Sequence, residues 1–267
     1  MTASPFDATQ YDLVRAAARE YAPDPYIAAT LAPRAVQPDL IALAAFTGDI
    51  DRIIATVSQP ALAEIRLEWW RLALHAPGNE RSGNALADAL RGVITRRDLP
   101  LAEFDAFLHA RAHELYADPV PDDETFAAYL DATDGALLRL AARIVPGAAP
   151  DASLVAAATS AIGRVRLLRD YPRLQARGRN PFPPRGSPAT PDLKAEILST
   201  YAALAHARGI WRHAPTADRT ACLPLGLVAP YLAAMQRPGH DLVRFLPEIS
   251  PLTRIGRLWA AAALGWV

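Results

Sequence analysis

The chain has 267 residues, 51 % of them hydrophobic, and its 28 basic residues balance its 28 acidic ones. This length and apolar content suffice for a sizeable core and exclude a largely disordered chain. A net charge of zero argues against a nucleic-acid partner, and the lone cysteine, Cys222, excludes internal disulfides and multi-cysteine metal sites. Because the chain shows neither a signal-peptide core nor the roughly 20 apolar residues of a membrane-spanning helix, we expect a cytoplasmic protein.

Helical periodicity dominates the chain, because apolar residues recur three and four positions apart and runs of alternating polarity are nearly absent. The clearest apolar stripe runs from Leu40 to Val57, and Pro60 then opens a second helix that ends before a turn at 76–78. Further helices are predicted at roughly 82–97, 101–117, 122–145, 151–176, 192–213, 218–236 and 251–265. We therefore predict a single all-α domain over residues 1–267.

The segment 180–191 differs from the rest, because its prolines lack backbone donors and prevent a helix. We interpret this Pro-rich loop either as a surface connection between two long helices or as the rim of a pocket.

Two predicted helices carry small and charged residues on one face. Thr47 and Asp51 share a face with small residues in the first helix, and Gly163, Arg166 and Asp170 do so in the second. These faces could form one polar pocket. Alternatively, Asp51 pairs with a neighbouring helix, and Arg166 and Asp170 form an ordinary ion pair four residues apart.

Other candidate chemistries carry less weight. His109 and His113 have a spacing that could hold a metal, but the neighbouring Arg111 and Glu114 suggest a solvated helix face, and no third ligand lies nearby. Cys222 has no histidine close in sequence, so we expect it to be a buried apolar residue.

An ordered set of motifs resembles the squalene/phytoene synthase family. The set comprises LAAFTGDIDR at 43–52, Ser58-x-Pro60, RLEWWR at 66–71, Tyr129-x5-Gly135, LRD at 168–170 and GRNPFP at 178–183. The resemblance covers roughly residues 24–185. It implies an isoprenoid synthase-like helical bundle around a central cavity. In that family, two Asp-x-x-x-Asp motifs hold Mg²⁺ ions, which help two prenyl diphosphates to ionise and join head to head.

Both aspartate motifs are eroded in this chain. Asp51 keeps the first carboxylate of its motif, but Ala55 stands where the second should be; Asp170 likewise remains, while Leu174 replaces its partner. Arg166 adds a permanent cation beside Asp170, about where a metal would sit, and a guanidinium repels Mg²⁺. We therefore expect no metal and no cofactor.

The resemblance extends to a branch with the same kind of erosion, the respiratory complex I assembly-factor branch and its bacterial relatives. It implies a non-catalytic protein that binds a prenyl or lipid-like ligand, or a protein partner, in an assembly or accessory role. Asp51 and Asp170 would be remnants of catalytic residues. The predicted ligand-binding residues are Thr47, Asp51, Tyr129, Arg166, Asp170, Arg173 and Arg179.

Two alternatives remain open. One is an active Mg²⁺-dependent prenyltransferase that recruits further carboxylates, for which Asp49, Asp131 and Asp134 are available. The other is a helical protein whose pocket has collapsed, which direct contact of Ala44 and Gly48 with Gly163 would indicate.

The C-terminal segment 255–267 is strongly apolar. It is either a final core helix or a short segment that contacts a membrane surface or a partner protein through Trp259 and Trp266.

Overall fold

A computed structural model describes residues 8–57, 59–77, 80–116, 118–184 and 191–267. Within these ranges the chain is helical and contains no strand, which confirms the predicted all-α class. The α-helices are α1 (Ala8–Tyr21), α2 (Pro23–Leu31), α3 (Gln37–Thr56), α4 (Pro60–His75), α5 (Ala85–Arg97), α6 (Leu101–His113), α7 (Asp123–Leu130), α8 (Ala136–Ile144), α9 (Ala152–Gln175), α10 (Leu193–Trp211), α11 (Thr216–Ala221), α12 (Val228–Met235) and α13 (Pro251–Leu264). A π-helical turn, η1 (Asp131–Gly135), and a 3₁₀ turn, η2 (Leu223–Leu227), complete the set.

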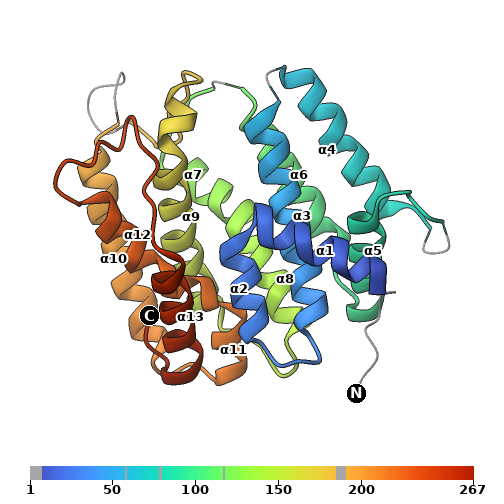
Figure 1. The fold of residues 1–267 in the computed structure, drawn as a ribbon. Coiled ribbons are helices and arrows are strands. Elements are labelled where there is room, and N and C mark those ends of the chain that lie inside the picture. The colour runs from blue at the N-terminus through green and yellow to red at the C-terminus, as the bar shows by residue number, and fades with distance from the viewer. Residues whose placement is uncertain (1–7, 58, 78–79, 117, 185–190) are drawn as a thin grey trace.

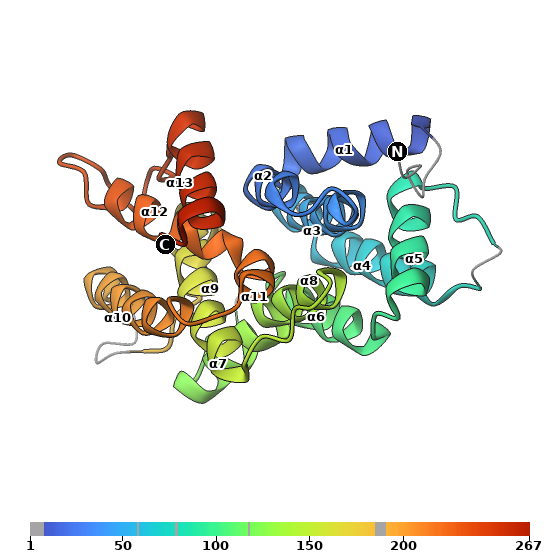
Figure 2. The same ribbon diagram turned by 90° about the horizontal axis from the view of Figure 1, so that it is seen from below.

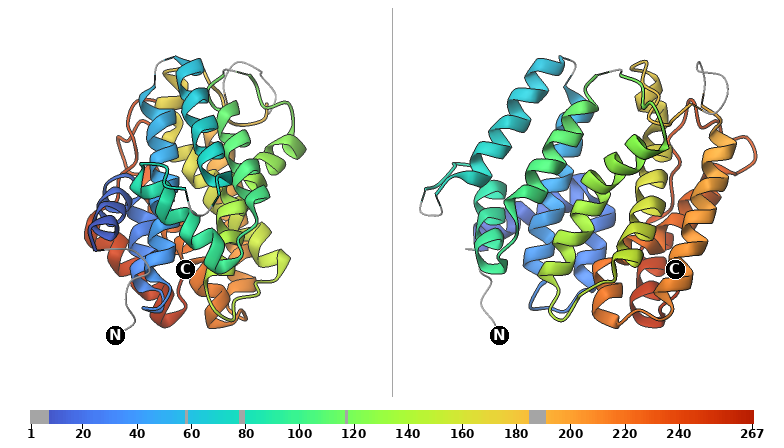
Figure 3. Two further views of the ribbon diagram at one scale, coloured as in Figure 1. Left: turned by 90° about the vertical axis from the view of Figure 1, so that its right-hand side faces the viewer. Right: turned by 180° about the vertical axis from the view of Figure 1, so that it is seen from behind.

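The helices form two groups around a common centre. Seen along the bundle, α1 to α6 occupy one side and α9, α10, α12 and α13 the other, while α8 and α11 lie between them (Figure 2). Long helices from both groups run side by side at a similar tilt (Figure 1, Figure 3). This arrangement brings α3 and α9, the two helices with polar faces, to opposite sides of the centre.

Three predicted helices are shorter or divided. The helix expected at 101–117 ends at His113, and that expected at 122–145 is interrupted by the π turn at Asp131–Gly135. The helix expected at 218–236 divides at Pro224, which opens η2 because proline fits the start of a helical turn but not its interior. Of the Pro-rich loop, residues 180–184 are not helical, and 185–190 lie outside the described residues.

The first two helices were not predicted, and they explain one of the glycines. A Cβ atom on Gly48 would lie 2.8 Å from the Cβ of Tyr21 and 2.9 Å from its carbonyl carbon. Gly48 therefore lets the junction of α1 and α2 approach α3 closely. This contact places α2 beside the central cavity.

Two apolar clusters support the cavity from either side. In the first, Phe46 of α3 packs edge-on against Trp70 of α4, with ring centroids 5.1 Å apart, and the Trp70 indole donates a 2.9 Å hydrogen bond to Asp49. The second contains the fully buried Trp211 and Tyr231. Of the two adjacent tryptophans, Trp70 is buried, whereas Trp69 is 38 % exposed.

Candidate functional site

A cavity of about 710 Å³ lies between the two helix groups. This volume is within the range of small-molecule pockets. Its apolar wall includes Leu43 and Ala44 of α3, Leu138 and Ala141 of α8, and Val165 of α9. The collapsed-pocket alternative is therefore wrong, because Ala44 lines the cavity, Gly48 packs against Tyr21 and Ala22, and Gly163 packs against Leu130 and Asp134.

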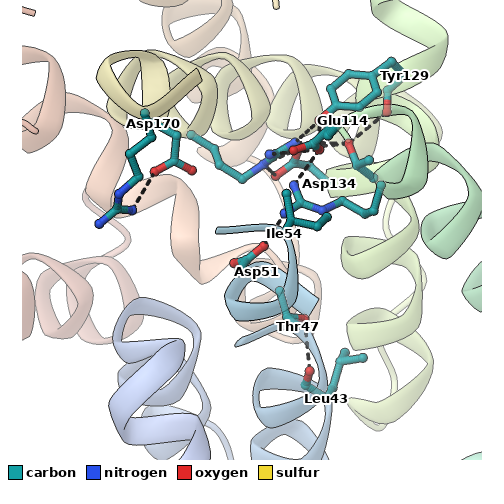
Figure 4. Close-up of polar contacts among 12 residues, drawn as sticks. Leu43, Thr47, Asp51, Ile54, Glu114, Tyr129, Asp134 and Asp170 are labelled. Atoms are coloured by element: carbon teal, nitrogen blue, oxygen red, sulfur yellow. Dashed lines mark hydrogen bonds and ion pairs between the residues drawn. The ribbon is translucent and has the colours of Figure 1, made fainter. Parts of the chain in front are cut away.

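Arg111, which lines the cavity, pairs with two carboxylates, those of Asp51 and Glu114, which Figure 4 labels. Its guanidinium lies 2.7 Å from Asp51 and 2.6 Å from Glu114, and its side chain is only 6 % exposed. The prediction that Arg111 and Glu114 form a solvated face is wrong, because charges on α3 and α9 compensate them in the interior. Asp51 thus pairs with a neighbouring helix.

Arg166 holds a second group of polar side chains next to the first. It contacts Asp134 at 3.0 Å, donates a 3.0 Å hydrogen bond to the Tyr129 hydroxyl, and lies 3.8 Å from Glu114. The Tyr129 hydroxyl in turn donates a short hydrogen bond to Glu114. We call these five residues, Arg111, Glu114, Tyr129, Asp134 and Arg166, the inner network.

Asp170 lies outside the inner network. Its carboxylate meets Arg173 at 3.5 Å, and both side chains are partly exposed. The alternative that Arg166 pairs with Asp170 is therefore wrong. The reason is the packing of η1 against α9: a Cβ on Gly163 would lie 2.9 Å from the Asp134 carboxylate, so the absence of a side chain there brings Asp134 to Arg166.

The two carboxyls that pair with Arg111 have pKa values shifted in opposite directions. Burial raises the pKa of the Asp51 carboxyl, and Arg111 offsets this effect only in part. The Asp51 side chain lines the cavity and is 43 % exposed. Burial by itself would also raise the pKa of Glu114. The charges of Arg111 and Arg166 outweigh burial, so the pKa of Glu114 is lowered. Burial also raises the pKa of the Tyr129 hydroxyl.

The other predicted ligand-binding residues differ in position. Thr47 and Arg173 line the cavity, although the Thr47 hydroxyl already donates to the carbonyl of Leu43, 3.0 Å away. Tyr129 and Arg179 do not line it: Tyr129 contacts lining residues, and Arg179 donates to the backbone carbonyl of Glu114. Their roles in binding stay predictions.

A second polar cluster, three of whose four members line the cavity, was not predicted. Asp24 of α2 accepts hydrogen bonds from the Tyr231 hydroxyl at 2.7 Å and from Arg169 at 2.9 Å, and its other oxygen meets Arg254 of α13. The Arg169 guanidinium stacks 4.0 Å from the centre of the Tyr231 ring. We call these four residues the outer cluster.

The carboxylates at the cavity do not fit a Mg²⁺ site. Mg²⁺ needs oxygen ligands in near-octahedral geometry, whereas Asp51, Glu114, Asp134 and Asp170 each have an arginine against an oxygen. Across the described part of the chain, no three His, Cys, Asp or Glu side chains are grouped to hold a metal.

Of the three further carboxylates proposed as metal ligands, two lie away from the cavity. Asp49 pairs with Arg52 at 2.6 Å and Asp131 with Arg139 at 2.7 Å, and neither lines the cavity; only Asp134 of the three further carboxylates does.

The two histidines and the cysteine also lie away from the cavity lining. The Nε2 atoms of His109 and His113 are 3.2 Å apart on an exposed face. Cys222 is buried as expected, which raises the pKa of its thiol to about 12.

Comparisons with known proteins identify the family and the fold. The sequence profile of squalene/phytoene synthases matches residues 18–186. The chain belongs to this family. No curated protein sequence shows significant similarity to it.

Three solved structures share the family fold. Squalene synthase HpnC from Alicyclobacillus acidocaldarius is 20 % identical with a TM-score of 0.69, and the match covers 89 % of this chain and 96 % of that one. A dehydrosqualene synthase in complex with a ligand is 12 % identical with a TM-score of 0.74, covering 96 % of both chains. YisP from Bacillus subtilis is 16 % identical with a TM-score of 0.67, covering 94 % and 95 %. The predicted squalene synthase-like fold is thus confirmed.

Family membership does not settle two finer expectations, the assembly-factor branch and the cytoplasmic location. None of the comparisons points to the complex I assembly-factor branch, so that assignment stays a hypothesis. Among the residues that the structure describes, no helix has both the length and the apolar character needed to cross a bilayer.

Proposed function

We propose that this protein binds a largely apolar, prenyl- or lipid-like ligand in the central cavity, without a divalent metal and without joining prenyl diphosphates. The observation that carries the proposal is the pairing of the cavity carboxylates with arginines. In this interpretation, guanidinium groups have taken the place of metal ions.

The energetics of the inner network favour retention of those arginines. A metal at Glu114 and Asp134 would have to displace Arg166, whose side chain is 19 % exposed. Separating a buried guanidinium from its carboxylate costs about 3–5 kcal/mol, and Mg²⁺ is itself reluctant to lose its water shell. Metal binding here would therefore have to overcome both the loss of the buried ion pair and the dehydration of Mg²⁺.

The cavity suits a ligand with one polar end. Its apolar wall would take a hydrocarbon chain, and Arg169 and Arg173 line the cavity with partly exposed guanidiniums. Arginine binds phosphate oxygens well without a metal. A prenyl diphosphate or another lipid-like anion has this chemistry. An assembly or accessory role, with a protein partner, is the wider role that we propose for such a binding protein.

The alternative function is an active Mg²⁺-dependent prenyltransferase. Two of the structures with this fold are those of a squalene synthase and a dehydrosqualene synthase, and here Asp51 and Asp170 both face the cavity. Catalysis of that type would require Arg111 and Arg173 to release these carboxylates.

Thermal unfolding with farnesyl diphosphate, with and without Mg²⁺, separates the two functions when products are followed by mass spectrometry. We expect a shift that does not depend on Mg²⁺ and no condensation product. Ligand at a hundredfold its Kd stabilises a protein by about 2.7 kcal/mol. A Mg²⁺-dependent shift with a squalene- or phytoene-like product would instead establish the transferase.

Two matched variants locate the binding. Ala141→Phe fills part of the cavity and should abolish the shift, whereas Ala128→Phe makes the same change on the exposed face of α7 and should preserve it. An equal shift in both variants would place the ligand outside the cavity.

A double substitution tests whether Arg166 blocks a metal site. Arg166→Asn with Leu174→Asp removes the guanidinium and restores a second carboxylate four residues after Asp170. We expect Mg²⁺ affinity, measured by calorimetry, to rise at least about tenfold, because multiple free carboxylates are what the ion requires. Unchanged Mg²⁺ binding would contradict the proposed role of Arg166.

A further inference from the structure

The last helix, α13, has two distinct apolar faces. Leu258 and Ala261 are buried against the bundle, as expected of a core helix. Leu252, Ile255 and Trp259 lie three and four residues apart on another face and are 83 %, 49 % and 54 % exposed. We call these three residues the outer face of α13. Only one side of the segment therefore belongs to the core.

The composition around the outer face fits a lipid surface. Trp266, which follows the helix, is 65 % exposed, and tryptophan prefers the interface between water and lipid. The segment 251–267 contains no acidic residue, and of its two arginines Arg257 is exposed, whereas Arg254 is paired with Asp24. The positive charges of Arg257 and Arg212 also act on Arg208 of α10, which places further basic side chains nearby. Anionic headgroups would complement this end of the molecule.

A second exposed apolar stripe lies on α4 and differs from the outer face of α13 in the charges beside it. On α4, Leu62, Ile65, Trp69 and Leu72 are 38 % to 65 % exposed. Their spacing of three and four residues resembles that of α13, but on α4 Glu64 and Glu68 balance Arg66 and Arg71, so this helix offers no excess positive charge. Carboxylates are repelled by anionic lipid, so the α4 stripe fits a lipid surface less well than α13 does.

The inner side of α13 connects the outer face to the cavity. Arg254 of this helix pairs with Asp24, and Asp24 and Tyr231 line the cavity. A lipid surface bound to α13 would therefore lie one helix away from the cavity wall. A prenyl- or lipid-like ligand partitions into bilayers, so this is a short path between its source and its site.

We propose that the outer face of α13 docks the protein onto an anionic lipid bilayer, with Leu252, Ile255 and Trp259 inserted at the headgroup level. The docking follows from α13 itself, whereas its use in delivering a ligand rests on the proposed function. The helix lies in the plane of the interface, as amphipathic anchors do.

Co-sedimentation of the full chain with vesicles tests the docking. The vesicles are phosphatidylcholine alone or mixed with phosphatidylglycerol. We expect binding to the mixed vesicles and a loss of about tenfold or more for Ile255→Ser with Trp259→Ser. The matched control, Ile65→Ser with Trp69→Ser on α4, should bind like the unmodified protein. Arg257→Glu should weaken binding to mixed vesicles only.

A second variant distinguishes a loss of docking from a loss of folding. Leu252→Asp changes the most exposed side chain of the outer face, so folding should be unaffected while vesicle binding falls at least about tenfold. The farnesyl diphosphate shift in solution should persist in this variant, which separates the failure of docking from the failure of ligand binding. Absence of vesicle binding by the unmodified protein, or an equal loss in the α4 control, would overturn the proposal. Self-association abolished by Leu252→Asp without vesicle binding would also overturn it, and would assign the face to a second copy of the chain.

Discussion

The two aspartates that the sequence assigns to the family's motifs, Asp51 and Asp170, are 43 % and 40 % exposed, but the arginines that pair with them have opposite surroundings. Asp51 pairs with Arg111, whose side chain is 6 % exposed and whose other nitrogen contacts Glu114. Asp170 pairs with Arg173, which is 59 % exposed. An arginine neutralises each carboxylate, but only the first pair is part of a buried network.

This difference shows how an arginine compensates a carboxylate in the interior and at the rim of the cavity. In the interior, an unpaired charge is costly, so compensation by Arg111 extends to Glu114, Tyr129 and Arg166. At the rim, water solvates Asp170, so one loose ion pair suffices. The inner network should therefore govern stability, and the rim pair should remain available to a ligand.

The largest effect should come from Arg111→Ala. This substitution removes a buried guanidinium from the buried Glu114 and the partly exposed Asp51, and we expect a loss of about 3–5 kcal/mol in the free energy of unfolding, mainly from Glu114. Urea denaturation measures it. A loss below about 1 kcal/mol would show that water compensates these carboxylates and that the network is not closed.

Tyr129→Phe should have an intermediate effect. The Tyr129 hydroxyl donates to Glu114 and accepts from Arg166, so its removal leaves two charged groups with one hydrogen bond fewer each. We expect a loss of about 1–3 kcal/mol by the same denaturation. Tyr116→Phe, at a 41 % exposed tyrosine, is the matched control and should change stability by less than about 0.5 kcal/mol.

The pH dependence of stability should distinguish two carboxyls that share Arg111. The pKa of Glu114 is lowered on folding, so its contribution is present above its unfolded pKa, about 4.3, and is lost as pH falls through the folded value. The pKa of Asp51 is raised, so its contribution declines as pH rises from about 3.9 through the folded value.

Glu114→Gln should therefore flatten the acid limb of the stability profile, and Asp51→Asn should steepen the rise of stability with pH. Thermal unfolding between acid and neutral pH measures both slopes. A change in slope of the same sign in both variants, relative to the unmodified protein, would contradict the opposite pKa shifts.

The sequence predicted the two helices that face each other better than the network between them. The apolar stripe of α3 and the small residues on α9 identified both elements, and Thr47, Asp51, Arg166 and Asp170 all line the cavity. These features are local, because a helical period is repeated within one segment.

The inner network was missed because its partners are distant in sequence. Arg111 and Glu114 form a pair three residues apart that looks the same on a solvated face as in a core. Only Asp51, 60 residues away, and Arg166 show that the pair is buried. The outer cluster was missed for a similar reason: its carboxylate, Asp24, lies on α2, which no strong periodicity indicated, and its other members come from three further helices.

The smallest effect on stability should come from Arg173→Ala, which tests the ion pair of Asp170 at the cavity rim. Because the ion pair with Asp170 spans 3.5 Å between partly exposed side chains, its loss should change the free energy of unfolding by less than about 0.5 kcal/mol. The same variant should weaken binding of farnesyl diphosphate several-fold, because it removes a cation from the cavity rim. Arg244→Ala, which breaks a similar 3.5 Å pair with Asp241 away from the cavity, is the control that should leave ligand binding unchanged. A stability loss in Arg173→Ala comparable to that of Arg111→Ala would mean that the rim pair contributes to the folded core as much as the inner network does. The ion pairs of Asp51 and Asp170 would then not differ in their effect on stability.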